Sequence, residues 1–71
     1  MNTKRERFEK VAAKRTQKII ALLDLLGNCS NKNNYEYNEK DVDKMFRIIR
    51  NKIKQNELLF KQRIKKMEFK F

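Results

Sequence analysis

The chain has 71 residues and a net charge of +10, with no His, no Pro, one Cys and one Gly. Such a length allows one small domain, residues 1–71, with a thin core. A single Cys excludes an internal disulfide, and one Cys without His leaves no plausible zinc site. We therefore expect self-association or a partner to support the fold.

The positive charge is concentrated near the two ends of the sequence. Residues 1–18 carry seven basic and two acidic side chains, and residues 47–71 carry nine and two. The intervening residues 19–46 carry three basic and five acidic side chains. Clusters of one sign on this scale are typical of proteins that bind a polyanion.

Little in the sequence points to catalysis or to membrane insertion. His, the usual general base near neutral pH, is absent, and no evident base accompanies Cys29 or Ser30. The acidic residues from Glu36 to Asp43 lack the spacing of a calcium loop. The longest apolar run, residues 19–26, is interrupted by Asp24 and is too short to span a bilayer. We expect a cytoplasmic protein that is not an enzyme and uses no metal or cofactor.

The first expected element is an amphipathic helix over residues 4–26. Thr3 and Glu6 have the spacing of a capping box, and Gly27 follows where a left-handed glycine would end the helix. Apolar residues recur at steps of three and four, which predicts one apolar face. These residues are Phe8, Val11, Ala12, Ile19, Leu22, Leu23 and Leu26.

Residues 27–38 form the expected connector, which is rich in Asn and contains Tyr35 and Tyr37. Asn favours turns because its side chain hydrogen-bonds to nearby backbone. Twelve residues is long for a connection between helices, and long loops often have a function. The two tyrosines either form a short extended segment or fold back over the end of the core.

The second expected helix covers residues 39–68 and begins after Asn38. Glu39, Asp41 and Asp43 lie in its first turns, where carboxylates complement the helix dipole. Its apolar positions fall within an arc of about 100°. They are Val42, Met45, Phe46, Ile49, Ile53, Phe60, Ile64, Met67 and Phe71.

Together these elements predict an all-α fold, an antiparallel two-helix hairpin. That pairing places Leu26 near Val42 and Phe8 near Phe60, and it gathers both basic segments at the open end. Several apolar residues lie off this seam, and a second copy would cover them in a dimeric helical bundle. The off-seam residues are Ile20, Ala21, Leu25, Ile48, Leu58, Leu59 and Phe69.

The basic residues are arranged as two ridges, one on each predicted helix. Those of the first helix step by three, four and four residues, and those of the second fall within about 80° of one another. Two such ridges could follow phosphates, so nucleic acid is the leading expected partner. The ridge residues are Arg7, Lys10, Lys14, Lys18, Arg47, Arg50, Lys54, Lys61 and Lys65.

Two polar residues interrupt the apolar faces. Arg15 lies within the apolar arc of the first helix, and Asn56 lies within that of the second. Antiparallel pairing would bring them near the same layer, where they could fix register or subunit number. Alternatively, Arg15 extends outward to water along its aliphatic stem.

Two other functions remain open. Tyr35 and Tyr37, with Leu58 and Leu59, could bind an acidic partner protein. The basic, amphipathic end of the second helix could lie on an anionic membrane, although Glu68 weakens that interpretation. No helix-turn-helix is visible, since the connector is too long for its tight turn.

The stretch from Arg7 to Phe46, with LLGNCSNKNNYEYNEKDV at its centre, resembles small uncharacterised proteins encoded on plasmids and other mobile elements of low-GC Gram-positive bacteria. The resemblance implies a bacterial, cytosolic accessory protein and assigns no site residues. Combined with the ridges, it suggests an accessory or regulatory protein that binds nucleic acid through the phosphate backbone.

Overall fold

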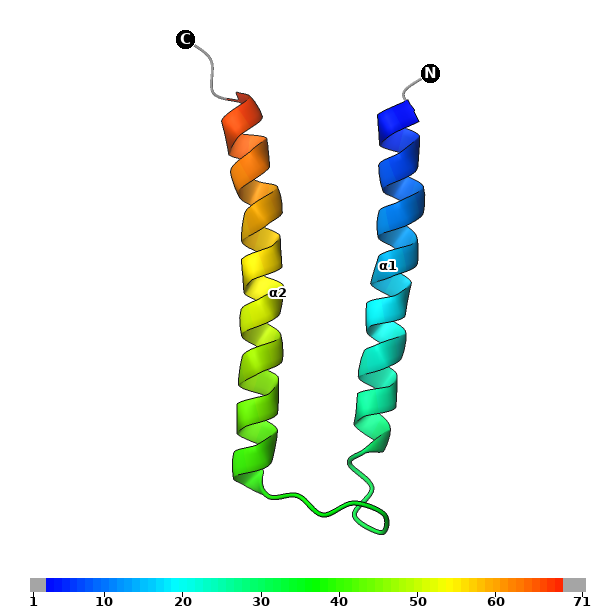
Figure 1. The fold of residues 1–71 in the computed structure, drawn as a ribbon, viewed down its shortest axis with the longest axis vertical. Coiled ribbons are helices and arrows are strands. Elements are labelled where there is room, and N and C mark those ends of the chain that lie inside the picture. Colours follow the sequence, from blue (N-terminus) through cyan, green and yellow to red (C-terminus); the bar gives the residue numbers. More distant parts are fainter. Residues whose placement is uncertain (1–2, 69–71) are drawn as a thin grey trace. The chain divides into compact units, whose positions relative to one another are not determined.

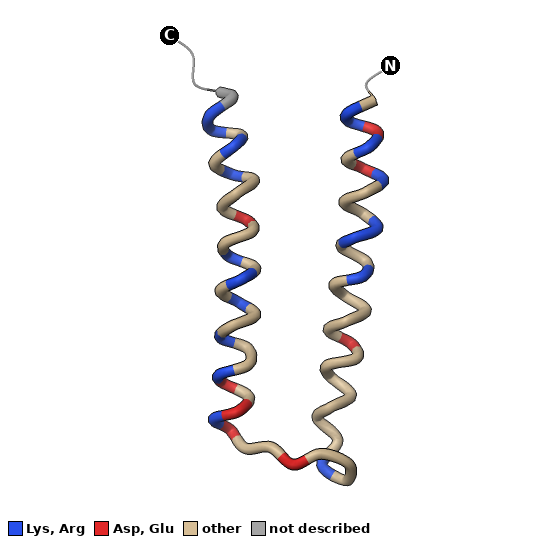
Figure 2. Tube along the Cα trace, viewed as in Figure 1, with Lys and Arg blue, Asp and Glu red and all other residues tan. Residues whose placement is uncertain are grey.

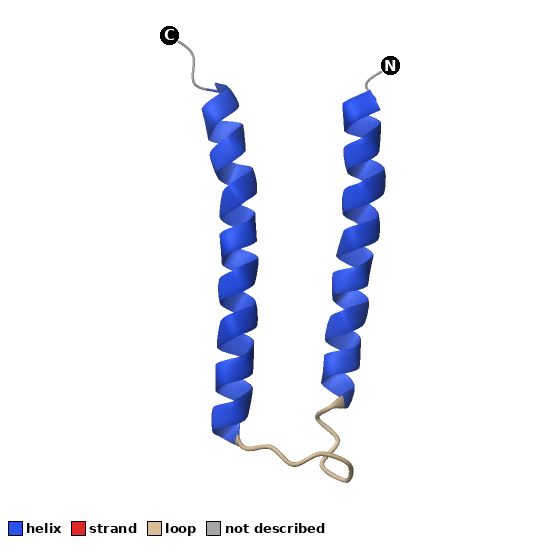
Figure 3. Cartoon of the chain, viewed as in Figure 1, coloured by secondary structure: helices blue, strands red, loops and turns tan. Residues whose placement is uncertain are grey.

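The computed structural model describes residues 3–68, which form two α-helices and a connector (Figure 1). Helix α1 is Thr3–Asn28 and helix α2 is Glu39–Glu68, and no strand occurs within this described part (Figure 3). The all-α prediction with two helices is therefore confirmed. The chain divides into two units, Met1–Glu36 and Tyr37–Phe71, each built on one helix. The single domain, the hairpin pairing and the dimer stay predictions.

Helix α1 begins at Thr3, one residue before the predicted start. Thr3 is itself helical, so it does not occupy the preceding position that a capping box requires. The first turns contain a different local interaction, in which Arg5 Nε donates to Glu9 Oε1 at 3.0 Å. The Arg5 guanidinium also lies 5.6 Å from the centre of the Phe8 ring. Such pairs one turn apart stabilise a helix by a few tenths of a kcal/mol, on the order of 0.3.

The end of α1 corrects the prediction that Gly27 is a left-handed cap. The helix continues through Gly27 to Asn28, and no glycine or other described residue has a positive φ. The backbone instead closes with tight turns, as Cys29 N–H donates to the Leu26 carbonyl and Ser30 N–H to the Gly27 carbonyl, both at 3.0 Å. These bonds satisfy carbonyls at the helix end without a left-handed residue.

Asn31 organises the connector, which occupies residues 29–38 between the two helices. Its carbonyl accepts hydrogen bonds from Asn34 N–H at 3.1 Å and Tyr35 N–H at 3.0 Å. Its side-chain Oδ1 accepts a third, from Asn33 N–H at 3.0 Å. This is the local bonding that makes Asn favourable in turns, and it confirms the reason for expecting a turn here.

The start of α2 is capped from both sides. Asp41 N–H donates to Asn38 Oδ1 at 2.9 Å, and Asn38 N–H donates to Asp41 Oδ2 at 3.0 Å. The two side chains thus form a reciprocal capping box. Tyr37 and Val42 occupy the two positions of a hydrophobic staple around it, and both are half-buried. The predicted start after Asn38 is confirmed.

The apolar stripes of the helices are not buried within the described chain. No described side chain is fully buried, and only six residues are half-buried. Half-buried positions are Ala12, Leu26, Tyr37, Val42, Met45 and Ile49. Phe69, Phe71 and the side chain of Met67, which the sequence places on or beside the stripe of α2, lie outside the described residues. Most of the apolar surface of both stripes is therefore exposed to solvent in the described residues.

Candidate nucleic-acid interface

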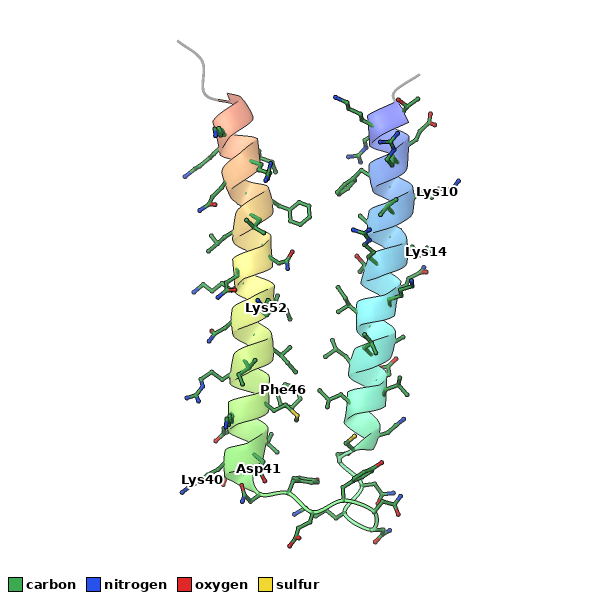
Figure 4. The ribbon with its side chains drawn as sticks, in the orientation of Figure 1. Lys10, Lys14, Lys40, Asp41, Phe46 and Lys52 are labelled. Atoms are coloured by element: carbon green, nitrogen blue, oxygen red, sulfur yellow. The ribbon has the colours of Figure 1, made fainter. Side chains whose placement is uncertain are left out.

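The ridge of α1 consists of exposed cations on one side of the helix. Arg7, Lys10, Lys14 and Lys18 are all exposed, and Lys10 and Lys14 leave the helix on the same side (Figure 4). At a rise of 1.5 Å per residue, the ridge is about 16 Å long. Lys18 is the last basic residue of α1, so residues 19–28 of this helix carry no positive charge (Figure 2).

The ridge of α2 is longer and falls into two clusters. Arg47, Arg50 and Lys54 form the first cluster, Lys61 and Lys65 form the second, and all five side chains are exposed. From Arg47 to Lys65 the ridge spans about 27 Å, with a gap of about 10 Å between the clusters. The gap is comparable to the width of the DNA major groove, about 12 Å.

One acidic residue interrupts the ridge of α2. Glu57 Oε1 lies 3.7 Å from Lys61 Nζ, and both side chains are more than half exposed. Sequence reasoning missed this pair, although Glu followed by Lys four residues later is a recognisable signal. An exposed pair of this kind contributes only about 0.3–0.5 kcal/mol. Breaking this pair therefore costs little free energy, so Lys61 could bind a phosphate in place of Glu57.

Charge is distributed unevenly along α2, as Figure 2 shows. Its first five residues, 39–43, contain three acidic side chains and one basic side chain. Residues 44–66 contain nine basic side chains and one acidic. The acidic start complements the helix dipole, while the rest of the helix presents a nearly continuous positive charge.

The two polar residues of the stripes are exposed in their own helices. Arg15 and Asn56 are both accessible, as are the apolar residues beside them on each stripe. No ion pair of Arg15 is formed within the described residues. Their proposed role in fixing register or subunit number stays a prediction.

Within the second unit, the residues of the alternative partner site do not form one patch. Tyr37 packs at the start of α2, about 30 Å along the helix from Leu58 and Leu59. Tyr35 belongs to the first unit and is 52% exposed on the Asn31 turn. Leu58 and Leu59 are also exposed, at 46% and 54%, but consecutive helical positions face directions about 100° apart. Tyr35 is thus the most available aromatic ring of this set.

Residues 3–68 contain no group of three or more side chains suited to holding a metal ion. Neither of the two described helices is both long enough and apolar enough to cross a membrane.

Comparison with the known protein families, with curated proteins and with solved structures gives no match. A function for this chain has to be argued from its own residues.

Proposed function

We propose that this chain is a small nucleic-acid-binding protein, an accessory or regulatory factor of a mobile element, that acts mainly through the phosphate backbone. The observation that carries the proposal is the ridge of α2, where five exposed cations share one side of the helix. A face that served solubility alone would usually mix both signs.

Backbone binding suits the chemistry of these ridges. Six of the nine ridge residues are lysines, which bind phosphate as point charges on flexible stems. Sequence-specific readout instead uses bidentate side chains presented into a groove by a defined motif. We therefore expect affinity that depends steeply on salt and little on sequence.

The scaffold that we propose for the ridges is an antiparallel hairpin that assembles as a dimeric bundle. The stripes of α1 and α2 repeat the same spacing of four, three, four, three and four residues. This order is the same in both directions, so antiparallel helices match position for position. In matching order, the sets are Phe8, Ala12, Arg15, Ile19, Leu22 and Leu26 on α1, and Phe60, Asn56, Ile53, Ile49, Phe46 and Val42 on α2.

A single hairpin leaves apolar side chains in water on its outer faces. Ile20, Leu25 and Ile48 are 55%, 62% and 58% exposed. Full burial of a large aliphatic side chain contributes about 1.5–3 kcal/mol, so covering such residues with a second copy stabilises the bundle. The mobile-element setting rests on the resemblance of residues 7–46 alone.

Mobility-shift titration with a short DNA duplex and a matched RNA duplex at two salt concentrations tests nucleic-acid binding. Replacing Lys14, Lys18, Arg50 and Lys54 with Glu should abolish the shift and leave the helical circular-dichroism spectrum unchanged. If the unmodified chain causes no shift even at low salt, the proposal fails.

A second candidate function is binding to an acidic protein. It is favoured by the exposed Tyr35 ring, which the three hydrogen bonds to Asn31 hold on an ordered turn. Capture of an acidic protein that is lost on Tyr35→Ala, together with no nucleic-acid shift, would support it. Flotation with anionic vesicles tests the minor alternative, membrane-surface binding by α2.

A further inference from the structure

Helix α2 presents an apolar stripe that the described residues of its own unit leave largely exposed. Beyond the half-buried Val42, Met45 and Ile49 near its start, the stripe is open along the rest of the helix. Ile53, Phe60 and Ile64 are 53%, 56% and 55% exposed. Phe46 sits on the same stripe (Figure 4). A second apolar helix is the natural cover for a surface of this shape.

The charge along α2 restricts which neighbour can lie there and in which direction. Residues 39–43 are net acidic, whereas residues 44–66 carry nine basic side chains and one acidic. A parallel copy of α2 would place each basic segment beside an identical one over its whole length. An antiparallel copy places the acidic start of each helix beside the basic end of the other.

We propose that a second copy of this chain packs its α2 antiparallel on the α2 stripe, with Ile53 near the two-fold axis. In this register Phe46 faces Phe60 of the second copy, and Val42 faces its Ile64. Asp43 then lies on the same flank as Lys61 and Lys65 of the second copy, within about one helical turn of each along the axis. The apolar layers and the opposite charges therefore agree on one register, and this agreement points to a second copy as the occupant.

The inference rests on the dimeric bundle proposed above and does not depend on nucleic-acid binding. It adds the direction of the second copy, which decides where the ridges lie in the assembly. In an antiparallel arrangement, the Lys65 ends of the two α2 ridges lie at opposite ends of the α2 pair. A parallel arrangement would gather both at one end.

Spin-label distances in the full chain test the direction. Cys29→Ser removes the native thiol, and one label is then placed at Glu39→Cys, on the flank of the stripe at the start of α2. Antiparallel pairing separates the two Glu39 labels by 28 residues of rise, about 40 Å. The matched control label at Lys52→Cys lies near the two-fold axis and should give roughly 20 Å or less, since packed helix axes are about 8–10 Å apart. Short distances at both positions indicate parallel helices and overturn the proposal.

Disulfide trapping gives a second readout that avoids labels. In the Cys29→Ser background, Phe46→Cys chains mixed with Phe60→Cys chains should form the mixed disulfide in preference to either self-disulfide. Preferential self-disulfides would overturn the register. A monomer in analytical ultracentrifugation at labelling concentrations, with or without anionic vesicles, would overturn the second copy itself. Because no nucleic acid is present, either failure leaves the mobility-shift result to be judged separately.

Discussion

The ridge of α2 predicts a loss of affinity that depends on position as well as on charge. We compare two double variants of α2. One carries Arg50→Gln and Lys54→Gln, both on the ridge, and the other carries Lys52→Gln and Lys66→Gln, both off the ridge. Both pairs remove two positive charges from α2, and Gln keeps the helix propensity close to that of Lys or Arg. Lys52 lies about 160° around the helix from both Arg50 and Lys54, so it faces away from a duplex on that side.

The size of the effect follows from counterion release. Each phosphate contact lowers the slope of log K against log salt by about 0.9. Two lost contacts therefore weaken binding about 60-fold at 0.1 M salt and about 3-fold at 0.5 M salt. The off-ridge pair should weaken binding far less, because a helix diameter of about 10 Å equals one Debye length at 0.1 M.

Fluorescence anisotropy with a labelled 20-base-pair duplex, titrated at four salt concentrations, measures both slopes. The ridge variant should show a slope smaller than that of the unmodified chain by about 1.8. Equal losses for the two variants would refute the ridge, since net charge alone would then explain binding. Unchanged affinity of the ridge variant would refute it as well.

Three further predictions concern the scaffold. Gly27→Ala should raise the melting temperature by about 2–8 °C. A Cβ at this helical position meets no atom within 4 Å, and Ala is favoured over Gly in helices by about 0.5–1 kcal/mol. A lower melting temperature would instead indicate a left-handed Gly27. Asn38→Ala should cost about 1 kcal/mol by removing the cap of α2, measured by chemical denaturation, whereas Asn38→Ser should retain most of the stability; equal losses would argue against the cap. Arg15→Leu combined with Asn56→Leu should raise thermal stability and broaden the distribution of oligomers, and an unchanged single species in ultracentrifugation would contradict a role for these two polar residues in fixing the oligomer.

The two helices and the faces of their residues were predictable because these properties are local. Steps of three and four residues place Phe8 with Leu22, and Arg50 with Lys54, on one side of any α-helix. The start of α2 could also be predicted, since Asn followed three residues later by Asp is a capping pattern. These signals need no information about distant parts of the chain.

The ends of α1 were predicted less well because competing local arrangements differ little in free energy. Gly27 can end a helix in a left-handed turn or continue it, and the hydrogen bonds of Cys29 and Ser30 to the preceding turn favour continuation here. Thr3 likewise joins the helix rather than capping it. Either choice shifts a boundary by one or two residues.

By itself, the sequence determined the all-α class, the apolar stripes and the two basic ridges, because composition and helical periodicity fix all three. Only the three-dimensional structure decided that Gly27 is helical, that Asn31 organises the connector and that the stripe of α2 stays largely exposed beyond Ile49. Burial depends on what surrounds a side chain, and a single helix supplies only part of those surroundings.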